Sequence, residues 1–145
     1  MNRTFTCLVV AGALASCSTG PEPLQYGKDV CEQCRMMIMD PAFGAEIVTA
    51  RGKIFRFDAA ECMLDYLQAG TADPEKDRFL TTDMAAPRTL IDARTAFYVI
   101  DPAFRSPMGG NIASFTTRRR AENSERDPAS RVLTWDQLLQ TRRSP

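Results

Sequence analysis

A short sequence that occurs twice is the feature that most constrains the fold of this chain. The tetrapeptide DPAF stands at residues 40–43 and again at 101–104, and the spacing I-x-x-F occurs at 54–57 and again at 112–115. This similar spacing suggests a duplicated unit. Because a unit of about 50 residues buries too little apolar surface to be stable alone, we expect two related units that pack on a common core.

The first copy predicts two strands followed by a helix. Residues 43–57 (FGAEIVTARGKIFRF) contain two β-prone runs on either side of an Arg-Gly pair, a pattern typical of a hairpin with a tight turn. The helix that follows is predicted to start at Asp58 as N-cap, with Glu61 completing a capping box. Gly70 suits the position just after its end.

The second copy repeats this pattern more loosely. Strands are predicted at 96–100, 111–115 and 132–133, helices at 117–126 and 136–140, and polar connections at 71–78 and 84–95. Together the elements predict the α+β class. We expect a first ββα(β) unit over residues 31–85 and a second over residues 86–145.

The N-terminus has the pattern of a bacterial lipoprotein signal. Arg3 precedes an apolar run that is shorter than the roughly 20 residues needed to span a bilayer. The run ends in LASC at residues 14–17, which is similar to a lipobox. We therefore expect 1–16 to be a signal peptide that takes no part in the fold. Cys17 would carry lipid, and residues 17–30 would form a flexible tether; an ordinary signal peptide is the alternative.

Composition narrows the classes of function. The chain has 18 Lys and Arg, 18 Asp and Glu and no histidine, so no overall charge attracts it to nucleic acid. The basic run at residues 118–120 is interpreted as a solvated helix face, because acidic residues follow it at ion-pair spacing. Without histidine or a pair of carboxylates in a motif, acid–base and hydrolytic catalysis have little support. We expect a protein that is not an enzyme.

Three cysteines remain once Cys7 leaves with the signal and Cys17 carries lipid: Cys31, Cys34 and Cys62. An odd number in an oxidising compartment favours a free thiol or metal ligands over a disulfide scaffold. Cys31 and Cys34 form a C-x-x-C pair, and three methionines follow it within five residues.

A C-x-x-C pair has three physical uses. Dithiol exchange usually places the pair at a helix N-terminus, but a tether without an apolar strand precedes it here. Structural zinc takes four nitrogen or sulfur ligands, one more than the three thiols supply. Thiolates and thioethers together favour Cu(I), which the absence of histidine supports. A thiol-disulfide oxidoreductase acting on a partner and a zinc-bearing interaction module remain as alternatives.

The candidate metal ligands are Cys31, Cys34, Met36, Met108 and Cys62. Met36 stands close enough to the C-x-x-C pair to fold back onto it. Met108 lies in the turn-rich SPMGGN segment, where a large apolar side chain has little reason to pack. Cys62 is either a ligand or a small buried hydrophobic residue. The other methionines are predicted to fill the core: Met37, Met39, Met63 and Met84.

In combination these motifs resemble the NosL family. The chain contains, in order, the lipobox, C-x-x-C-x-M-x-I from Cys31, FGAEI, GKIFRFDAAECMLDYL and FYV…SPMGG…F. The resemblance implies a periplasmic, lipid-anchored Cu(I) chaperone. It would serve maturation of the copper centre of nitrous oxide reductase, together with an ABC-type assembly complex in the membrane. It also implies a fold of two related ββαβ units, similar to a domain of organomercurial lyase.

The resemblance also implies where the copper ligands lie. The family's C-x-x-C-x-M falls on Cys31, Cys34 and Met36, and its P-M-G loop falls on Met108. Some members are expected to add a histidine, which this chain lacks. Our hypothesis is that copper lies between a thiolate of the first unit, Cys31 or Cys34, and Met108 of the second unit.

Overall fold

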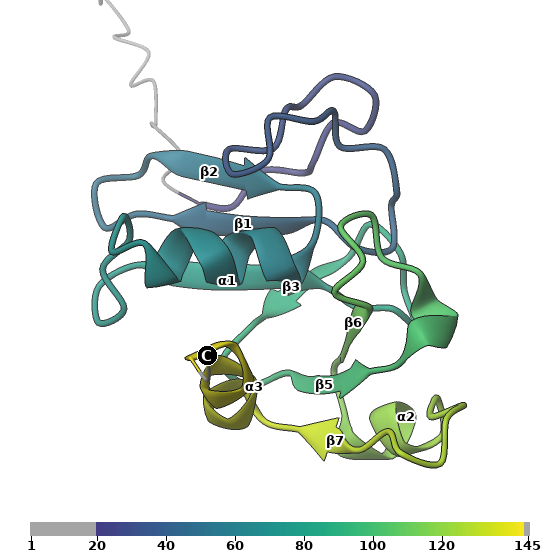
Figure 1. The fold of residues 1–145 in the computed structure, drawn as a ribbon. Helices are drawn as coiled ribbons and strands as arrows, with labels where there is room; N and C mark the ends of the chain where they lie inside the picture. Colours follow the sequence, from purple (N-terminus) through teal and green to yellow (C-terminus); the bar gives the residue numbers. More distant parts are fainter. Residues whose placement is uncertain (1–19, 144–145) are drawn as a thin grey trace, which may run out of the picture.

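A computed structural model of the chain describes residues 20–143 and contains two small antiparallel sheets with helices packed against them (Figure 1). This arrangement confirms the predicted α+β class. The predicted signal peptide and the lipidation at Cys17 lie outside the described residues. No helix within residues 20–143 combines the length and apolar character needed to cross a membrane.

The first sheet has four strands in the order β2-β1-β3-β4. The elements are β1 (Ala45–Val48), β2 (Ile54–Phe57), α1 (Ala60–Gln68), β3 (Arg78–Thr82) and β4 (Leu90–Asp92). The predicted hairpin is confirmed, because β1 and β2 are antiparallel and Gly52 in their turn has a φ of +82°. Phe55 and Phe57 point to the same face of β2, where both rings lie 5.2 Å from the ring of Tyr66 on α1.

Helix α1 begins differently from the prediction. Its N-cap is Ala59, which makes no side-chain cap hydrogen bond, so the predicted capping box of Asp58 and Glu61 is wrong. The Glu61 side chain instead meets hydrogen-bond donors from the second half of the chain. The predicted end is confirmed, because Gly70 follows the helix with a φ of +73° and its amide donates to the carbonyl of Leu67.

The second sheet has three strands in the order β6-β5-β7. This part of the chain contains β5 (Phe97–Ile100), a 3₁₀ turn (Pro102–Phe104), β6 (Ile112–Phe115), α2 (Arg118–Glu122), β7 (Val132–Leu133) and α3 (Trp135–Arg143). The three predicted strands are confirmed. Helix α2 is shorter than predicted and α3 is longer.

Strand β4 corrects the prediction of a connection over residues 84–95. It pairs with β3, with Thr82 opposite Leu90 and Leu80 opposite Asp92. Three residues carry no readable period, so only this pairing makes them a strand. The boundary predicted between residues 85 and 86 stays a prediction, and β4 belongs to the four-stranded sheet.

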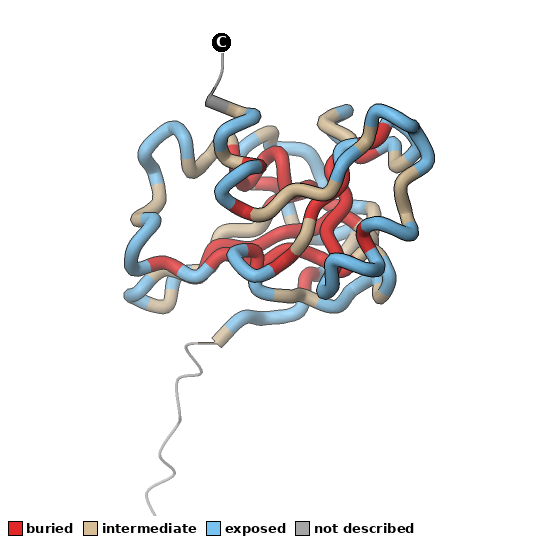
Figure 2. The backbone as a smooth tube through the Cα atoms, turned by 90° about the horizontal axis from the view of Figure 1, so that it is seen from below, coloured by how far each residue is buried: buried red, intermediate tan, exposed pale blue. Residues whose placement is uncertain are grey.

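The two sheets share one core, which runs through the centre of the molecule (Figure 2). Trp135 at the start of α3 contacts both sheets. Its ring centroid lies 5.8 Å from that of Phe79 on β3 and 6.2 Å from that of Tyr98 on β5. The hydroxyls of Thr81 and Ser114 form a buried hydrogen bond of 2.8 Å between β3 and β6. The two halves are therefore expected to unfold together.

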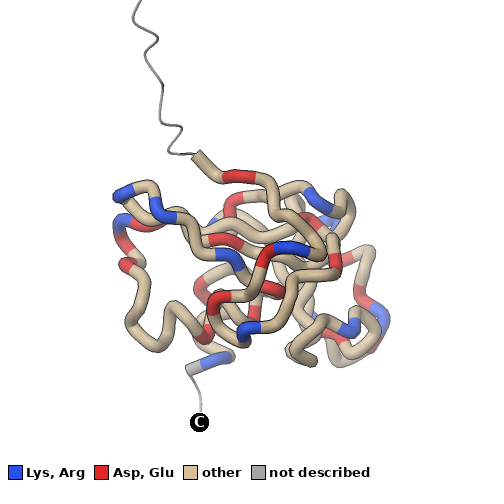
Figure 3. The backbone as a smooth tube through the Cα atoms, turned by 90° about the horizontal axis from the view of Figure 1, so that it is seen from above, with Lys and Arg blue, Asp and Glu red and all other residues tan. Residues whose placement is uncertain are grey.

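Acidic and basic residues are interspersed over the described part of the chain rather than gathered on separate sides (Figure 3). Within residues 20–143, Arg56 on β2 lies close to three acidic side chains. Its Nη2 lies 2.8 Å from Glu22, and its Nε lies 3.2 Å from Asp29 and 3.6 Å from Glu46. Because Leu24 is also buried, residues 22–30 of the predicted tether pack on the domain.

Glu46 lies at the centre of the first sheet with its side chain fully buried. Neither of its carboxyl oxygens has a hydrogen-bond partner within residues 20–143. Loss of hydration on burial raises the pKa of Glu46 from 4.5 to about 7, although the neighbouring Arg56 acts in the opposite direction.

We expect Glu46 to make the protein less stable as the pH rises. Because its pKa is higher in the folded state, its contribution is complete below pH 4.5 and is lost as the pH rises through about 7. Between pH 5 and pH 8 the loss is about 2.5 kcal/mol, at about 1.4 kcal/mol per pKa unit. Glu46→Gln should remove this loss in urea unfolding at the two pH values. The prediction is wrong if wild type and variant show the same change with pH.

Candidate metal centre

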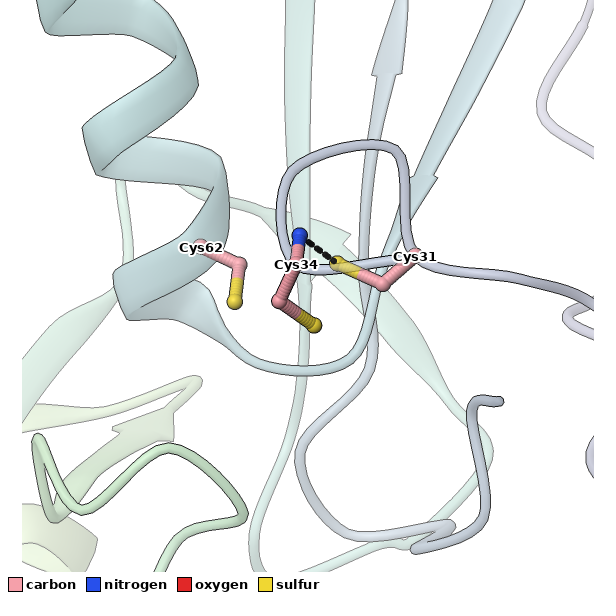
Figure 4. A group of neighbouring side chains, drawn as sticks. All are labelled: Cys31, Cys34 and Cys62. Carbon is pink, nitrogen blue, oxygen red and sulfur yellow. Dashed lines mark hydrogen bonds between the residues drawn. The ribbon is translucent and has the colours of Figure 1, made fainter. Parts of the chain in front are cut away.

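Three thiols meet between the N-terminal loop and the first turn of α1. The sulfur atoms of Cys31, Cys34 and Cys62 all lie within 4.8 Å of one another (Figure 4). Cys31 and Cys62 are buried, Cys34 is half-buried, and all three are free. This is the single such group of potential ligands found within residues 20–143.

The C-x-x-C pair lies on a tight loop and does not open a helix. The amide of Cys31 donates to the carbonyl of Met36 at 2.8 Å, and the amide of Arg35 donates back to the carbonyl of Cys31 at 3.0 Å. Arg35 has a φ of +64°, which lets the chain reverse between the two bonds. The loop points the amide of Cys34 at the sulfur of Cys31, 3.5 Å away (Figure 4).

These contacts favour one thiolate among the three thiols. Hydrogen bonding from the thiol of Cys62, with a smaller contribution from the amide of Cys34, lowers the pKa of Cys31 to about 5 despite its burial. Donation of the same hydrogen bond raises the pKa of Cys62, and burial raises the pKa of Cys34. At neutral pH the cluster therefore holds one negative charge and two protonated thiols, a donor set suited to a soft monovalent cation.

Met108 of the second half lies beside two of these thiols. Cys34, Cys62 and Met108 line the same cleft, which has a volume of about 340 Å³, together with Gln33, Glu61, Asp65, Gly109, Gly110 and Arg142. Met108 is exposed, at 45% of its surface. The structure thus brings the SPMGGN loop to the thiols, although it follows them by more than forty residues.

The remaining methionines divide into two groups. Met36 is exposed and does not line the cleft, although its carbonyl accepts from the amide of Cys31; its role as a ligand stays a prediction. The predicted core packing is confirmed for Met63 and Met84. It is wrong for Met37 and Met39, which are exposed, because they lie on the irregular surface segment after the C-x-x-C loop rather than on a strand or helix that turns them inward.

Two acidic residues beside the cluster were not recognised as part of the site. Asp58 is buried, and burial, followed by the charge of Cys31, raises its pKa to about 6. Glu61 lines the cleft and is 2% exposed. Asp58 and Glu61 stand four residues and one residue before Cys62, which could have indicated that they lie near the thiols. The capping-box pattern explained both residues in another way.

These features define a small α+β protein with two sheets, a shared core and a histidine-free cluster of three thiols. The chain belongs to the NosL family, whose model matches residues 25–142. No curated protein matches it. Among solved structures, it is similar to the crystal structure of the copper chaperone NosL from Shewanella denitrificans, with a TM-score of 0.70 and 22% identity. The match covers 84% of this chain and 99% of the other, and at this identity it shows the fold.

Proposed function

We propose that this protein is a Cu(I) chaperone that binds one ion at Cys31, Cys34 and Cys62 and passes it on without catalysing a reaction. The observation that carries the proposal is the meeting of three sulfur atoms within 4.8 Å in a chain without histidine. Thiolate sulfur is the donor that Cu(I) prefers. Membership of the NosL family, and the likeness to a copper chaperone with that name, support the proposal.

Binding would begin at Cys31, because its thiolate is already present at neutral pH. Cys34 and Cys62 would then lose their protons as they join the ion, since a thiol binds metal in its deprotonated form. Met108 would approach from the cleft and add a thioether ligand. A thioether does not titrate, so a partner that withdraws Met108 would weaken the site without a change of pH.

We further propose that the chaperone serves the maturation of nitrous oxide reductase and works with an ABC-type assembly complex. Lipid at Cys17 would hold it at the periplasmic side of the membrane. The lipobox at residues 14–17 and membership of the NosL family support this extension. Because Glu22 and Leu24 already contact the domain, lipid at Cys17 would hold the domain close to the membrane.

An anaerobic Cu(I) titration of the reduced chain lacking lipid (residues 18–145) tests the proposed function. In competition with a chromogenic chelator, we expect one tightly bound equivalent. Binding no stronger than the chelator's background would overturn the proposal. Zinc held by the purified protein and not displaced by Cu(I) would favour the zinc-bearing module, and turnover in insulin reduction would favour the oxidoreductase.

Met108→Leu tests the bridge between the two halves. The leucine keeps the size of the side chain and removes its sulfur, so we expect Cu(I) affinity to fall about tenfold, in the range found when a group that supports a metal site is lost. Met39→Leu is the matched control, because Met39 is exposed and does not line the cleft. Equal affinities for the two variants would show that Met108 is not a ligand.

A further inference from the structure

Glu61 connects the first turn of α1 to the loop that carries Met108. Its Oε1 accepts hydrogen bonds from the hydroxyl of Ser106 and from the amide of Gly110, the latter at 3.2 Å. These two donors stand on either side of Met108 in the sequence. The Ser106 oxygen also accepts a hydrogen bond from the amide of Asn111 at 2.7 Å. The hydroxyl is therefore held both as a donor, to Glu61, and as an acceptor, from Asn111.

The loop between the two donors is a tight turn. The amide of Gly109 donates to the carbonyl of Ser106 at 3.0 Å, which closes a β-turn with Pro107 and Met108 at its centre. Pro107 fixes its own φ at a value that suits the second position of a turn, and Gly109 has a φ of +74°. The turn is joined to β6 through Asn111, whose carbonyl accepts from the amide of Asp101 at 3.0 Å. The side-chain hydrogen bonds that tie the two ends of the turn to α1 are both made by Glu61.

Glu61 and the turn are in close contact. A Cβ atom added at Gly110 would lie 2.9 Å from the carboxyl carbon of Glu61 and 3.0 Å from its Cβ and Cγ, so the absence of a side chain at Gly110 permits the approach. Glu61 is 2% exposed. The hydrogen bond from Ser106 is buried and the one from Gly110 is part-buried, and hydrogen bonds shielded from water are stronger than exposed ones.

We propose that Glu61 is a positioning residue that holds the Met108 turn at the cleft lined by Cys34 and Cys62, and that Cu(I) is released when its hydrogen bonds to the turn break. The inference rests on the proposed function. Glu61 and Cys62 are consecutive residues of α1, so the Glu61 carboxylate and the Cys62 thiol keep the same position relative to each other. Pulling the turn away breaks the contacts of Glu61 and removes the Met108 sulfur in the same movement.

The first test compares Cu(I) binding in two variants at Glu61. Glu61→Ala removes the acceptor and should weaken binding about tenfold, mainly through faster dissociation, as expected for a group that orients a ligand. Glu61→Gln keeps an oxygen at the Oε1 position and should bind as wild type does. In a Met108→Leu background, Glu61→Ala should have little further effect, because both changes remove the same interaction.

A second measurement needs no copper. Amide hydrogen exchange at Gly110 in the metal-free protein should be faster in Glu61→Ala than in wild type, and unchanged in Glu61→Gln. Ser106→Ala gives an independent variant that loses one donor, and it should release Cu(I) faster than wild type. It also preserves the test if Glu61→Ala does not fold.

The outcomes separate this inference from the proposed function. If wild type binds Cu(I) but Glu61→Ala and Ser106→Ala bind equally well, the positioning role is wrong and the chaperone function stands. Full additivity of Glu61→Ala with Met108→Leu would overturn it in the same way. If wild type does not bind Cu(I), the proposed function and the release step both fail, and hydrogen exchange still decides whether Glu61 holds the turn.

Discussion

Replacing Cys31 with serine should weaken Cu(I) binding by at least about 100-fold. Cys31 is the thiol with the lowered pKa, and both other thiols are arranged around its sulfur. Loss of a group that only supports a metal site costs about 10–100-fold in affinity, and loss of a direct ligand should cost more. Serine keeps the size and shape of the side chain, but its oxygen is a poor ligand for a soft cation.

The pH dependence of binding provides a second expectation for the same site. Because Cys34 and Cys62 are protonated at neutral pH and must lose their protons to bind, wild-type affinity should rise between pH 6 and pH 8. Competition titrations at the two pH values measure this rise.

The Cys31→Ser result requires a check that the variant folds. A buried hydroxyl without a partner costs about 1–3 kcal/mol, so the metal-free variant should be measured by circular dichroism, with Cys31→Ala beside it. Folded Cys31→Ser that binds Cu(I) within a few-fold of wild type would contradict the assignment of Cys31 as a ligand. If Cys34→Ser lowers Cu(I) affinity much more than Cys31→Ser does, Cys34 is the more important ligand.

Trp135→Ala should lower the free energy of unfolding by about 3–5 kcal/mol, the usual cost of removing a large buried aromatic side chain. The ring packs between Phe79 of the first sheet and Tyr98 of the second. Its loss would leave a cavity that neither sheet can close without moving relative to the other. Urea unfolding followed by circular dichroism measures the effect, because Trp135 is the single tryptophan and its fluorescence is lost in the variant.

Trp135→Phe is the matched control, since a smaller aromatic ring keeps part of the contact and should cost less. In wild type, tryptophan fluorescence and circular dichroism should report the same transition, because one core serves both sheets. Two separate transitions, with Trp135→Ala affecting one of them, would show that the sheets unfold independently.

The sequence by itself determined the local structure and the kind of chemistry. Gly52 and Gly70 could be placed in a turn and after a helix, because glycine adopts a positive φ without the steric cost that other residues meet. The three thiols and the absence of histidine predicted a soft metal, because ligand preference depends on the side chain and not on the fold.

Only the tertiary structure decided which groups meet. Sequence patterns describe neighbours within a few positions, whereas Cys62 reaches Cys31 across the hairpin. Met108 lines one cleft with Cys34 and Cys62 because the second half packs on the first. The same limit explains the errors. Glu61 has the spacing of a capping residue, but it accepts a buried hydrogen bond from Ser106 and a part-buried one from Gly110 instead. A buried hydrogen bond is stronger than a solvent-exposed cap. Strand β4 exists because β3 offers it a partner, and Met37 and Met39 are exposed because nothing covers their loop in the described part of the chain.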